Sequence, residues 1–210
     1  MHYGERMAIR ETVARVSSHP KVYEFQRLVL GGRKLDAHVD RVVTRITQNR
    51  EPGVIIDVGG GTARSRALWP DDWTYFSIDP DDRMVEIDGP ESDVHRVVGS
   101  AGSLPFDDDF ADVVFMKDTS HHLDDATWSD SLKEMQRVLK PDGVFVFLDA
   151  VLNPKRRFSV WFWKLDNGKW PRSTEALEGG HQGELHGAGD RTVLVDPQRH
   201  PCDVYPTMSL

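Results

Sequence analysis

The sequence predicts an α/β fold built on a doubly wound, mostly parallel sheet. Short apolar runs alternate with helical patterns along the chain, and this order is typical of a parallel sheet with helices on both faces. The predicted strands are nearly apolar throughout, for example D-V-V-F-M at 112–116 and G-V-F-V-F-L at 143–148. Strands of that kind are buried on both sides, which favours a parallel sheet.

The individual elements follow from hydrophobic periodicity and from glycine and proline stops. Five strands are expected, over residues 54–58, 74–78, 94–98, 112–116 and 143–148. Helices are expected in the N-terminal region over 5–17, 21–30 and 34–48, and between strands over 62–69 and 81–87. A further helix is expected to bury one stripe, formed by Trp128, Leu132, Met135 and Leu139, and to stop at K-P-D-G.

Composition narrows the class of protein. The 210 residues are 39% hydrophobic and 29% charged, with a net charge of −8 and no basic run, which argues against nucleic acid as the substrate. One cysteine, Cys202, excludes an intrachain disulfide, and no Cys/His cluster has metal-ligand spacing, so we expect no metal site. No signal-peptide core and no apolar stretch of membrane-spanning length stand out, and we therefore expect a cytoplasmic location without a transmembrane segment.

The stretch V-I-I-D-V-G-G-G-T-A-R at 54–64 carries the chemistry. A strand that ends in a glycine turn lets a ligand approach the bare backbone closely. The string lacks the G-x-x-x-x-G-K-[ST] of a phosphate loop, and Arg64 stands where a dinucleotide fingerprint needs its third glycine. What remains is D-x-G-x-G-x-A, formed by Asp57, Gly59, Gly61 and Ala63. A nicotinamide-dependent oxidoreductase is a weaker alternative.

The pattern resembles motif I, [DE]-x-G-x-G-x-G, of the class I S-adenosylmethionine-dependent methyltransferases, of the small-molecule type (methyltransferase-domain 11/25-like). The resemblance continues through F-S-I-D-P at 76–80, G-S-A-G-S-L-P-F at 99–106 and L-K-P-D-G-V-F-V-F-L at 139–148. It implies a Rossmann-like sheet, with an N-terminal helical cap over 1–50, a cofactor-binding core over 51–174 and an irregular tail over 175–210.

The resemblance implies S-adenosyl-L-methionine as the cofactor and assigns the residues that bind it. The family's second strand ends in an acid that holds both ribose hydroxyls, here Asp79, and Met84 lies where an apolar side chain packs on adenine. Ser100 replaces the acid that usually accepts from the adenine amino group. The full predicted set is Asp57, Gly59, Gly60, Gly61, Asp79, Pro80, Met84, Ser100, Ala101 and Lys117. The alternative roles are local: loop capping for Asp57, turn formation for the glycines and packing for Lys117.

The segment M-K-D-T-S-H-H-L-D-D at 116–125 resembles the part of the family that faces the methyl acceptor. His121 is the candidate general base because imidazole titrates near neutral pH, and Asp118 is a candidate for orienting the acceptor or the histidine. Packing or surface roles remain alternatives for both. The expected acceptor is small or lipid-like, and Trp161, Trp163 and Trp170 either line its site or pack an amphipathic helix.

The C-terminal segment departs from the family, which closes its sheet with an antiparallel hairpin of strands six and seven. Residues 179–210 hold five glycines and three prolines, and only 192–195 has a strand pattern. Strands six and seven are therefore expected to be missing or aberrant, leaving an open edge beside strand five through which copies of the chain could associate. The alternative function is a catalytically impaired or binding-only remnant with an aberrant C-terminus. One origin would be a frameshift after Leu177, which the coding DNA sequence tests.

Overall fold

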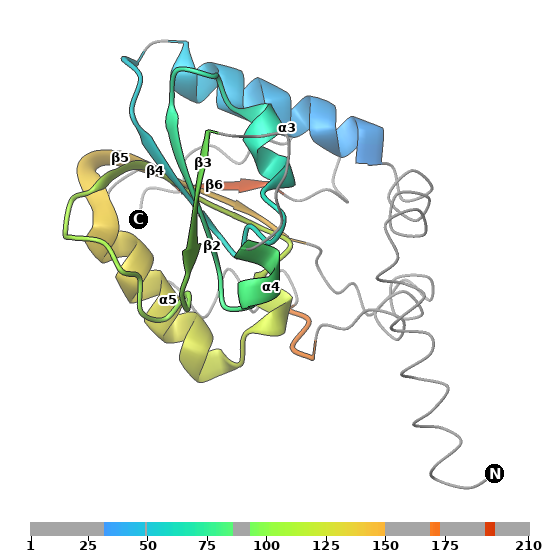
Figure 1. Ribbon diagram of the computed structural model, residues 1–210. Coiled ribbons are helices and arrows are strands. Elements are labelled where there is room, and N and C mark those ends of the chain that lie inside the picture. Colours follow the sequence, from blue (N-terminus) through green and yellow to red (C-terminus); the bar gives the residue numbers. More distant parts are fainter. Residues whose placement is uncertain (1–31, 49, 86–92, 150–168, 173–191, 196–210) are drawn as a thin grey trace, which may run out of the picture.

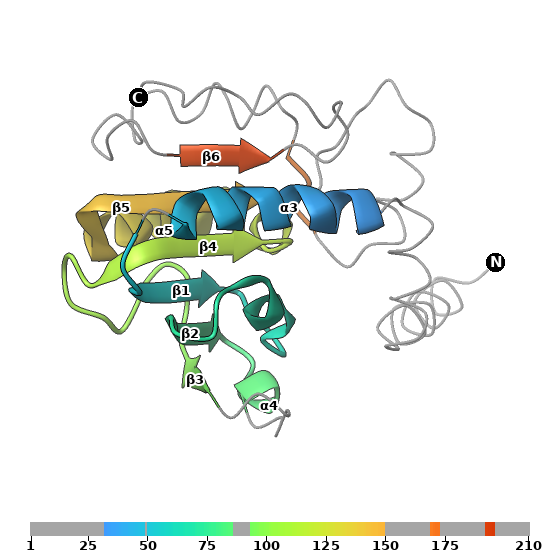
Figure 2. The same ribbon diagram turned by 90° about the horizontal axis from the view of Figure 1, so that it is seen from above.

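The computed structural model describes residues 32–48, 50–85, 93–149, 169–172 and 192–195. These residues form a six-stranded sheet in the order β3-β2-β1-β4-β5-β6, and each neighbouring pair is parallel (Figure 2). The strand order reverses between β1 and β4, so the carboxyl ends of these two strands flank the place where α/β sheets bind ligands. The predicted α/β class is confirmed.

Five of the six strands, β1 to β5, lie where the sequence predicts strands. Their bounds are β1 Val54–Val58, β2 Thr74–Asp79, β3 Val94–Val98, β4 Ala111–Lys117, β5 Leu139–Leu148 and β6 Thr192–Val195. The main difference is the start of β5, because K-P-D-G does not separate helix from strand. Ala111 pairs with Leu139 and Val113 pairs with Val144, so these residues form an irregularity within the strand.

Helices cover both faces of the sheet, with α3 on one face and α5 on the other (Figure 1). Their bounds are α3 Gly32–Thr47, α4 Asp82–Val85 and α5 Asp125–Val138, and two 3₁₀ turns lie at η1 Arg64–Leu68 and η2 Ser120–His122. The predicted helix over 62–69 is therefore a short 3₁₀ turn. In the described part of the chain, no helix is long and apolar enough to span a membrane.

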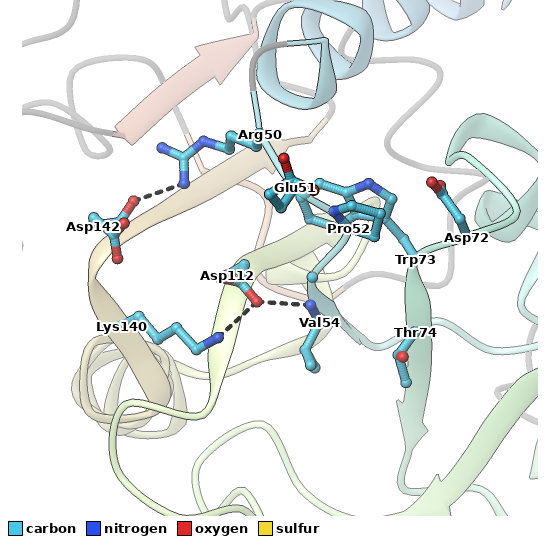
Figure 3. A pocket seen from close by; sticks show the side chains of 11 residues that line it. Arg50, Glu51, Pro52, Val54, Asp72, Trp73, Thr74, Asp112, Lys140 and Asp142 are labelled. Atoms are coloured by element: carbon cyan, nitrogen blue, oxygen red, sulfur yellow. Dashed lines mark hydrogen bonds and ion pairs between the residues drawn. The ribbon is translucent and has the colours of Figure 1, made fainter.

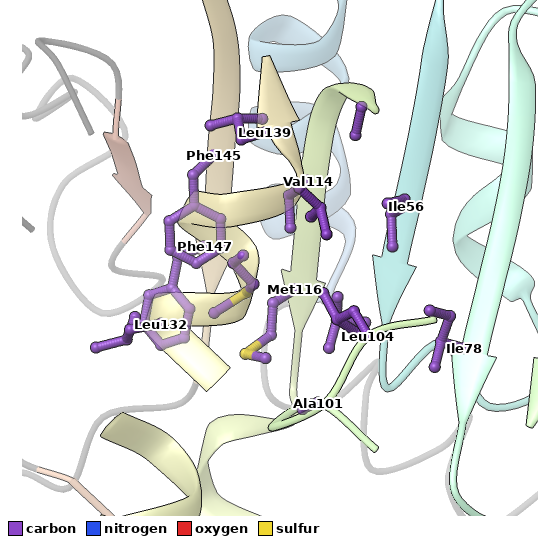
Figure 4. Close-up of a cluster of buried hydrophobic side chains, with 14 of the residues drawn as sticks. Ile56, Ile78, Ala101, Leu104, Val114, Met116, Leu132, Leu139, Phe145 and Phe147 are labelled. Atoms are coloured by element: carbon purple, nitrogen blue, oxygen red, sulfur yellow. The ribbon is translucent and has the colours of Figure 1, made fainter. Parts of the chain in front are cut away.

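Successive strand residues enter two separate cores. Ile55 and Val113 pack with the stripe Val39, Val42, Val43 and Ile46 of α3, whereas their neighbours Ile56 and Val114 pack on the α5 side. Figure 4 shows this second cluster, in which Met116, Phe145 and Phe147 gather beside Leu132. Each fully buried aliphatic or aromatic side chain contributes about 1.5–3 kcal/mol. This two-sided burial explains why the central strands β1 and β4 are nearly apolar throughout.

Helix α5 begins where its acidic start predicts. The Asp124 carboxylate accepts a hydrogen bond from the backbone N–H of Thr127 at 2.8 Å, which caps the first turn. Trp128, Leu132 and Met135 are buried, as predicted. Leu139 is also buried, but it is the first residue of β5 rather than the last of the helix.

The prediction of an open edge beside β5 is wrong. β6 pairs with β5 from Phe145↔Thr192 to Leu148↔Val195, so β6 is the outer strand of the described sheet. Its parallel direction differs from the family's antiparallel hairpin, and in this respect the predicted aberrant C-terminus is confirmed. The helices predicted over 5–17 and 21–30, the side chains of Trp161 and Trp163, and Cys202 lie outside the described residues.

Candidate functional site

The glycine turn after β1 is held against β2 by its backbone. Gly59 and Gly60 both donate their N–H groups to the carbonyl of Ile78, at 2.8 and 3.1 Å. Gly59 has φ +74°, and a Cβ atom there would lie 2.4 Å from the side chain of Thr119. A residue other than glycine would meet both backbone strain and overlap. The turn therefore needs glycine at this position for the chain's own packing.

Asp57 lies beneath this turn and is 1% exposed. Its carboxylate accepts a hydrogen bond from the Tyr75 hydroxyl, and a Cβ atom on Gly60 would lie 2.7 Å from its Oδ2. Burial raises the pKa of Asp57 to about 6, although the Tyr75 hydrogen bond and the positive charge of Lys117 lower it and Asp79 raises it. Asp57 is thus a buried acid that loses its proton just below neutral pH.

Asp79 faces the opposite side of the turn. Its Oδ2 accepts from the Gly61 N–H at 3.1 Å, and its Oδ1 accepts from the Asp81 N–H at 2.9 Å. Gly61 differs from the two preceding glycines, Gly59 and Gly60, because a Cβ atom there would meet nothing closer than Asp79 Oδ2, at 3.9 Å. Bare backbone and a half-buried carboxylate thus border open space, and the carboxylate retains acceptor capacity for a vicinal diol. This donor and acceptor set fits a nucleoside ribose.

The other predicted cofactor residues surround the same end of the sheet. Pro80 is exposed, and Met84 is half-buried on α4. Ser100 is exposed, and its Oγ accepts from the Gly102 N–H at 3.3 Å. Ala101 is buried in the core on the α5 side, which leaves its backbone for any cofactor contact. Lys117, the last residue of β4, pairs with Asp118 at 2.5 Å.

The residue at the third glycine of the motif, Ala63, adopts a left-handed backbone with φ +59°. It immediately precedes η1 and is completely buried. Glycine adopts this conformation without steric cost, whereas a residue with a Cβ atom pays roughly 1–2 kcal/mol. Ala63 therefore bears a backbone strain here that a glycine would avoid.

A second group of polar side chains follows β4 and β5. Asp149 comes directly after β5 and is 3% exposed. Its carboxylate contacts the Oγ of Ser120 at 2.5 Å, the backbone N–H of His121 at 3.3 Å and the Nδ1 atom of His121 at 2.6 Å. His121 is itself buried, and its ring lies 4.3 Å from that of His122. The structure thus places the ring of the predicted base His121 within hydrogen-bond distance of a carboxylate.

That carboxylate belongs to Asp149 and not to Asp118, the acid predicted from the sequence. Asp118 lies in a left-handed turn with φ +52°, donates its N–H to the Leu148 carbonyl at 2.8 Å and pairs with Lys117. Sequence reasoning missed Asp149, although a signal was present. It is an acid at the carboxyl end of a predicted parallel strand, where ligands bind in such sheets.

Arg172 fastens the turn that carries His121. Its guanidinium donates to the carbonyl of Ser120 and, at 2.9 Å, to that of Leu123, and it lies 5.2 Å from the ring centroid of Trp128. The backbone N–H of Trp170 donates to the His121 carbonyl at 3.1 Å. Trp170 and Arg172 therefore bind the η2 turn through hydrogen bonds to three of its carbonyls or those next to it, which are those of Ser120, His121 and Leu123.

The two groups meet through Thr119. Its side chain lies against Gly59, with Oγ1 3.4 Å from the Gly59 carbonyl oxygen, and it is only two residues from His121. We call the glycine turn at 59–61 together with Asp79 the cradle. The cradle and the His121–Asp149 pair therefore adjoin at the switch point between β1 and β4. An arrangement of this kind can bind a nucleoside on one side and remove a proton from a second molecule on the other.

A cavity of about 660 Å³ lies at the opposite edge of the sheet, around the amino ends of β1 and β2 (Figure 3). Two of its cations have partners beside it: Lys140 pairs with Asp112 at 2.9 Å, and Arg50 donates to the backbone carbonyl of Asp142 at 2.9 Å. None of the predicted site residues lines it. The candidate functional site is therefore the one at the carboxyl ends of the strands, around Asp79 and His121.

Comparison with known proteins shows a likeness to methyltransferases. Residues 56–147 match the family model described as methyltransferase domain. YcgJ of Bacillus subtilis, described as an uncharacterized methyltransferase, is 27% identical over 140 residues, which are 63% of this chain and 53% of that protein. The 2-methyl-6-phytyl-1,4-hydroquinone methyltransferase of Synechocystis is 30% identical over 120 residues, covering 54% of this chain and 37% of its own length.

Solved structures show the same fold. The crystal structure of YcgJ superposes with a TM-score of 0.56 at 22% identity, covering 68% of this chain and 65% of that one. Geranyl diphosphate methyltransferase, solved in complex with S-adenosylmethionine, superposes with a TM-score of 0.57 at 14% identity, covering 70% and 62%. The chain spans about half the length of YcgJ and less than two fifths of the hydroquinone methyltransferase.

Proposed function

We propose that the chain, whose residues 56–147 match the family model described as methyltransferase domain, is a class I S-adenosylmethionine-dependent methyltransferase that methylates a small or lipid-like acceptor. The observation that carries the proposal is the contact between Asp79 and the open face of Gly61. That carboxylate and that bare backbone suit the ribose of S-adenosylmethionine, which when bound supplies a methyl group on a positively charged sulfur.

The proposed cofactor residues divide the work between them. Asp79 accepts from the ribose hydroxyls, and Met84 packs on the adenine. Ser100 and the backbone of Ala101 border the adenine edge, with a neutral hydroxyl in place of the usual carboxylate. Asp57 acts beneath the turn, where its negative charge favours a cationic ligand once its proton is lost. Gly60, Pro80 and Lys117 shape the remaining rim.

The acceptor side has to align the attacking atom with the methyl group and exclude water. Orientation of that kind contributes about 7–11 kcal/mol, and a positioned base adds roughly 10²–10⁴-fold where the acceptor must lose a proton. We propose His121 as the base, while Asp118 contributes to the rim of the acceptor site with Lys117. The name of the Synechocystis relative supports a hydroquinone-type acceptor with an apolar substituent. The cytoplasmic location stays a prediction.

A binding-only remnant is the second candidate function, and two observations favour it. Ser100 removes a cofactor contact expected in the family, and β6 runs parallel where the family closes with an antiparallel hairpin. In this alternative the protein binds S-adenosylmethionine without transferring its methyl group.

Calorimetric titration with S-adenosylmethionine and S-adenosylhomocysteine tests the cofactor assignment. We expect both to bind the wild-type protein and Asp79→Asn to weaken both by at least tenfold, because an amide offers one acceptor oxygen in place of two. Asp130→Asn, an exposed site on α5, is the matched control and should bind like the wild type. Absence of binding would refute both candidate functions.

A methyl-transfer assay then separates the enzyme from the remnant. The assay follows labelled methyl from S-adenosylmethionine into an isoprenoid-substituted methylhydroquinone and a panel of small phenols. Transfer that is lost in Asp79→Asn supports the enzyme. Tight cofactor binding without transfer to any acceptor of the panel supports the remnant.

A further inference from the structure

Asp149 is surrounded by hydrogen-bond donors. It contacts the Ser120 hydroxyl at 2.5 Å, the His121 backbone N–H at 3.3 Å and the His121 ring at 2.6 Å, and all of these groups are buried. A buried carboxylate is costly unless donors and a positive charge compensate it. The guanidinium of Arg172 supplies that charge, since Asp149 and Arg172 interact electrostatically. The three donors and this positive charge all favour the ionised form of Asp149.

An ionised carboxylate only accepts hydrogen bonds, and this fixes the protonation of the histidine ring. The Nδ1 atom of His121 must carry the hydrogen that it shares with Asp149. In the neutral ring the basic lone pair then belongs to Nε2. The ring is also fixed in orientation, because Ser120 and the His121 backbone bind the second carboxylate oxygen, Oδ2, while Nδ1 binds Oδ1.

We propose that Asp149 is a positioning residue, which holds His121 in the tautomer whose Nε2 takes a proton from the methyl acceptor; this rests on the proposed function. Where S-adenosylmethionine is bound, the hydroxyl oxygen of the acceptor would attack its methyl carbon. The O–H bond breaks and the proton moves to Nε2, while the oxygen's electron pair forms the new O–C bond. The C–S bond breaks with its electrons left on the sulfur, and neutral S-adenosylhomocysteine is the leaving group. Asp149 then stabilises the imidazolium through the Nδ1–H bond. The acceptor class that requires such a step carries a weakly acidic hydroxyl, as in a phenol or hydroquinone whose pKa is about 10, like that of tyrosine.

A readout that needs no acceptor comes first. Nitrogen NMR of ¹⁵N-histidine-labelled protein distinguishes a protonated from an unprotonated ring nitrogen. We expect Nδ1 of His121 to be protonated and Nε2 unprotonated in the wild type at pH 7.5. In Asp149→Asn, the amide can donate to Nδ1, so the population of the opposite tautomer should rise. A wild-type ring with its proton on Nε2 would overturn the proposal, whatever the protein does to S-adenosylmethionine.

The kinetic test uses the isoprenoid-substituted methylhydroquinone as the probe acceptor. Asp149→Asn should lower kcat at least 100-fold, shift the acidic limb of its pH profile to lower pH, and leave the dissociation constant of S-adenosylhomocysteine within twofold. Asp130→Asn, the same substitution at the exposed α5 site, should change neither. Ser120→Ala removes one donor to Asp149 without touching the ring, and it should cause a smaller loss of kcat.

The outcomes separate the two proposals. If the wild type transfers methyl groups and Asp149→Asn does so with unchanged kcat and pH profile, the positioning role is refuted and the methyltransferase stands. If the wild type transfers none, the proposed function fails and the NMR result alone decides the role of Asp149. If Asp149→Asn does not fold, the wild-type NMR spectrum and the pH profile of Ser120→Ala carry the decision.

Discussion

The two halves of the candidate site are held in place by different means. The cradle at the ends of β1 and β2 depends on the backbone: Gly59 and Gly60 donate to one carbonyl, and Gly61 donates to Asp79. The half at the ends of β4 and β5 depends on side chains, through Asp149 and Arg172. A substitution in the glycine turn introduces backbone strain and steric overlap at once. A substitution in the side-chain network removes only the hydrogen bonds of one residue. The first half should therefore be intolerant of small changes that the second half absorbs.

Gly59→Ala should have the largest effect on stability. Its positive φ costs about 1–2 kcal/mol and the overlap with Thr119 costs about 1–3 kcal/mol, so we expect the free energy of unfolding to fall by about 3–4 kcal/mol. Gly61→Ala is the matched control, because φ is also positive but no atom lies closer than 3.9 Å; we expect a loss of about 1 kcal/mol. Urea unfolding measures both, and equal losses would contradict the role of Thr119.

Asp57→Asn should change how stability depends on pH. The pKa of the buried carboxyl rises from its ordinary value of 3.8 to about 6 on folding. Between these values the folded state holds more protons than the unfolded state, so stability falls as pH rises from about 4 to about 6. A pKa shift of this size changes the free energy of unfolding by about 3 kcal/mol over this pH range. Asn cannot ionise, so the substitution removes this dependence on pH.

The measurement is urea unfolding of wild type and Asp57→Asn at pH 4, 5, 6 and 7.5. The free energy of the variant minus that of the wild type should grow by up to about 3 kcal/mol across the series. Asp130→Asn, at an exposed position, should give a nearly constant difference. A difference for Asp57→Asn that also stays constant would mean that the carboxyl is ionised in the fold throughout.

Arg172→Met tests the side-chain half. The substitution removes hydrogen bonds to the carbonyls of Ser120 and Leu123 and the contact with Trp128. Methionine keeps part of the packing, so we expect a loss of about 2 kcal/mol. Amide hydrogen exchange should also accelerate at His122 and Leu123. Lys133→Met, which breaks an exposed pair with Asp130, should cost less than about 0.5 kcal/mol; a similar loss in the two variants would show that Arg172 does not fasten the turn.

Ala63→Gly should have the smallest effect, because two contributions oppose each other. Relief of the left-handed backbone at φ +59° favours glycine by roughly 1–2 kcal/mol. Loss of a buried methyl group and greater freedom of the unfolded chain disfavour it by a similar amount. We expect a net change within about 0.5 kcal/mol by thermal unfolding. Ala126→Gly, in the first turn of α5, lacks the compensating relief and should cost about 0.5–1 kcal/mol.

The cradle could be predicted from the sequence because its parts are close together in the chain. Asp57, Gly59 and Gly61 lie within one turn, and Asp79 ends the next strand. Strand bounds were predictable for a similar reason: apolar runs such as 54–58 and 112–116 are set by burial on both faces. The start of β5 was not, because Pro141 and Gly143 are usual in a helix stop and nothing local reveals a bulge.

The acceptor half could be predicted only in part. His121 stands out in its segment, but its carboxylate partner lies 28 residues away and Arg172 contacts Ser120 across 52 residues. Contacts of this length depend on how β4 and β5 pair, and an acid such as Asp118 is the natural guess when only neighbours in the chain are considered. The placement of 192–195 beside β5 likewise depends on pairing, which the strand pattern of T-V-L-V does not specify.

The late position of β6 in the chain sets an order for folding during synthesis. β1 to β5 are finished at Leu148, and the His121–Asp149 contact needs only one more residue. Residues 149–191 must follow before β6 exists to pair. At about 5–20 residues per second, the nascent chain then spends on the order of 2–9 s with a bare β5 edge beside a completed cradle. The last strand is thus an addition to a sheet whose chemical groups are already assembled.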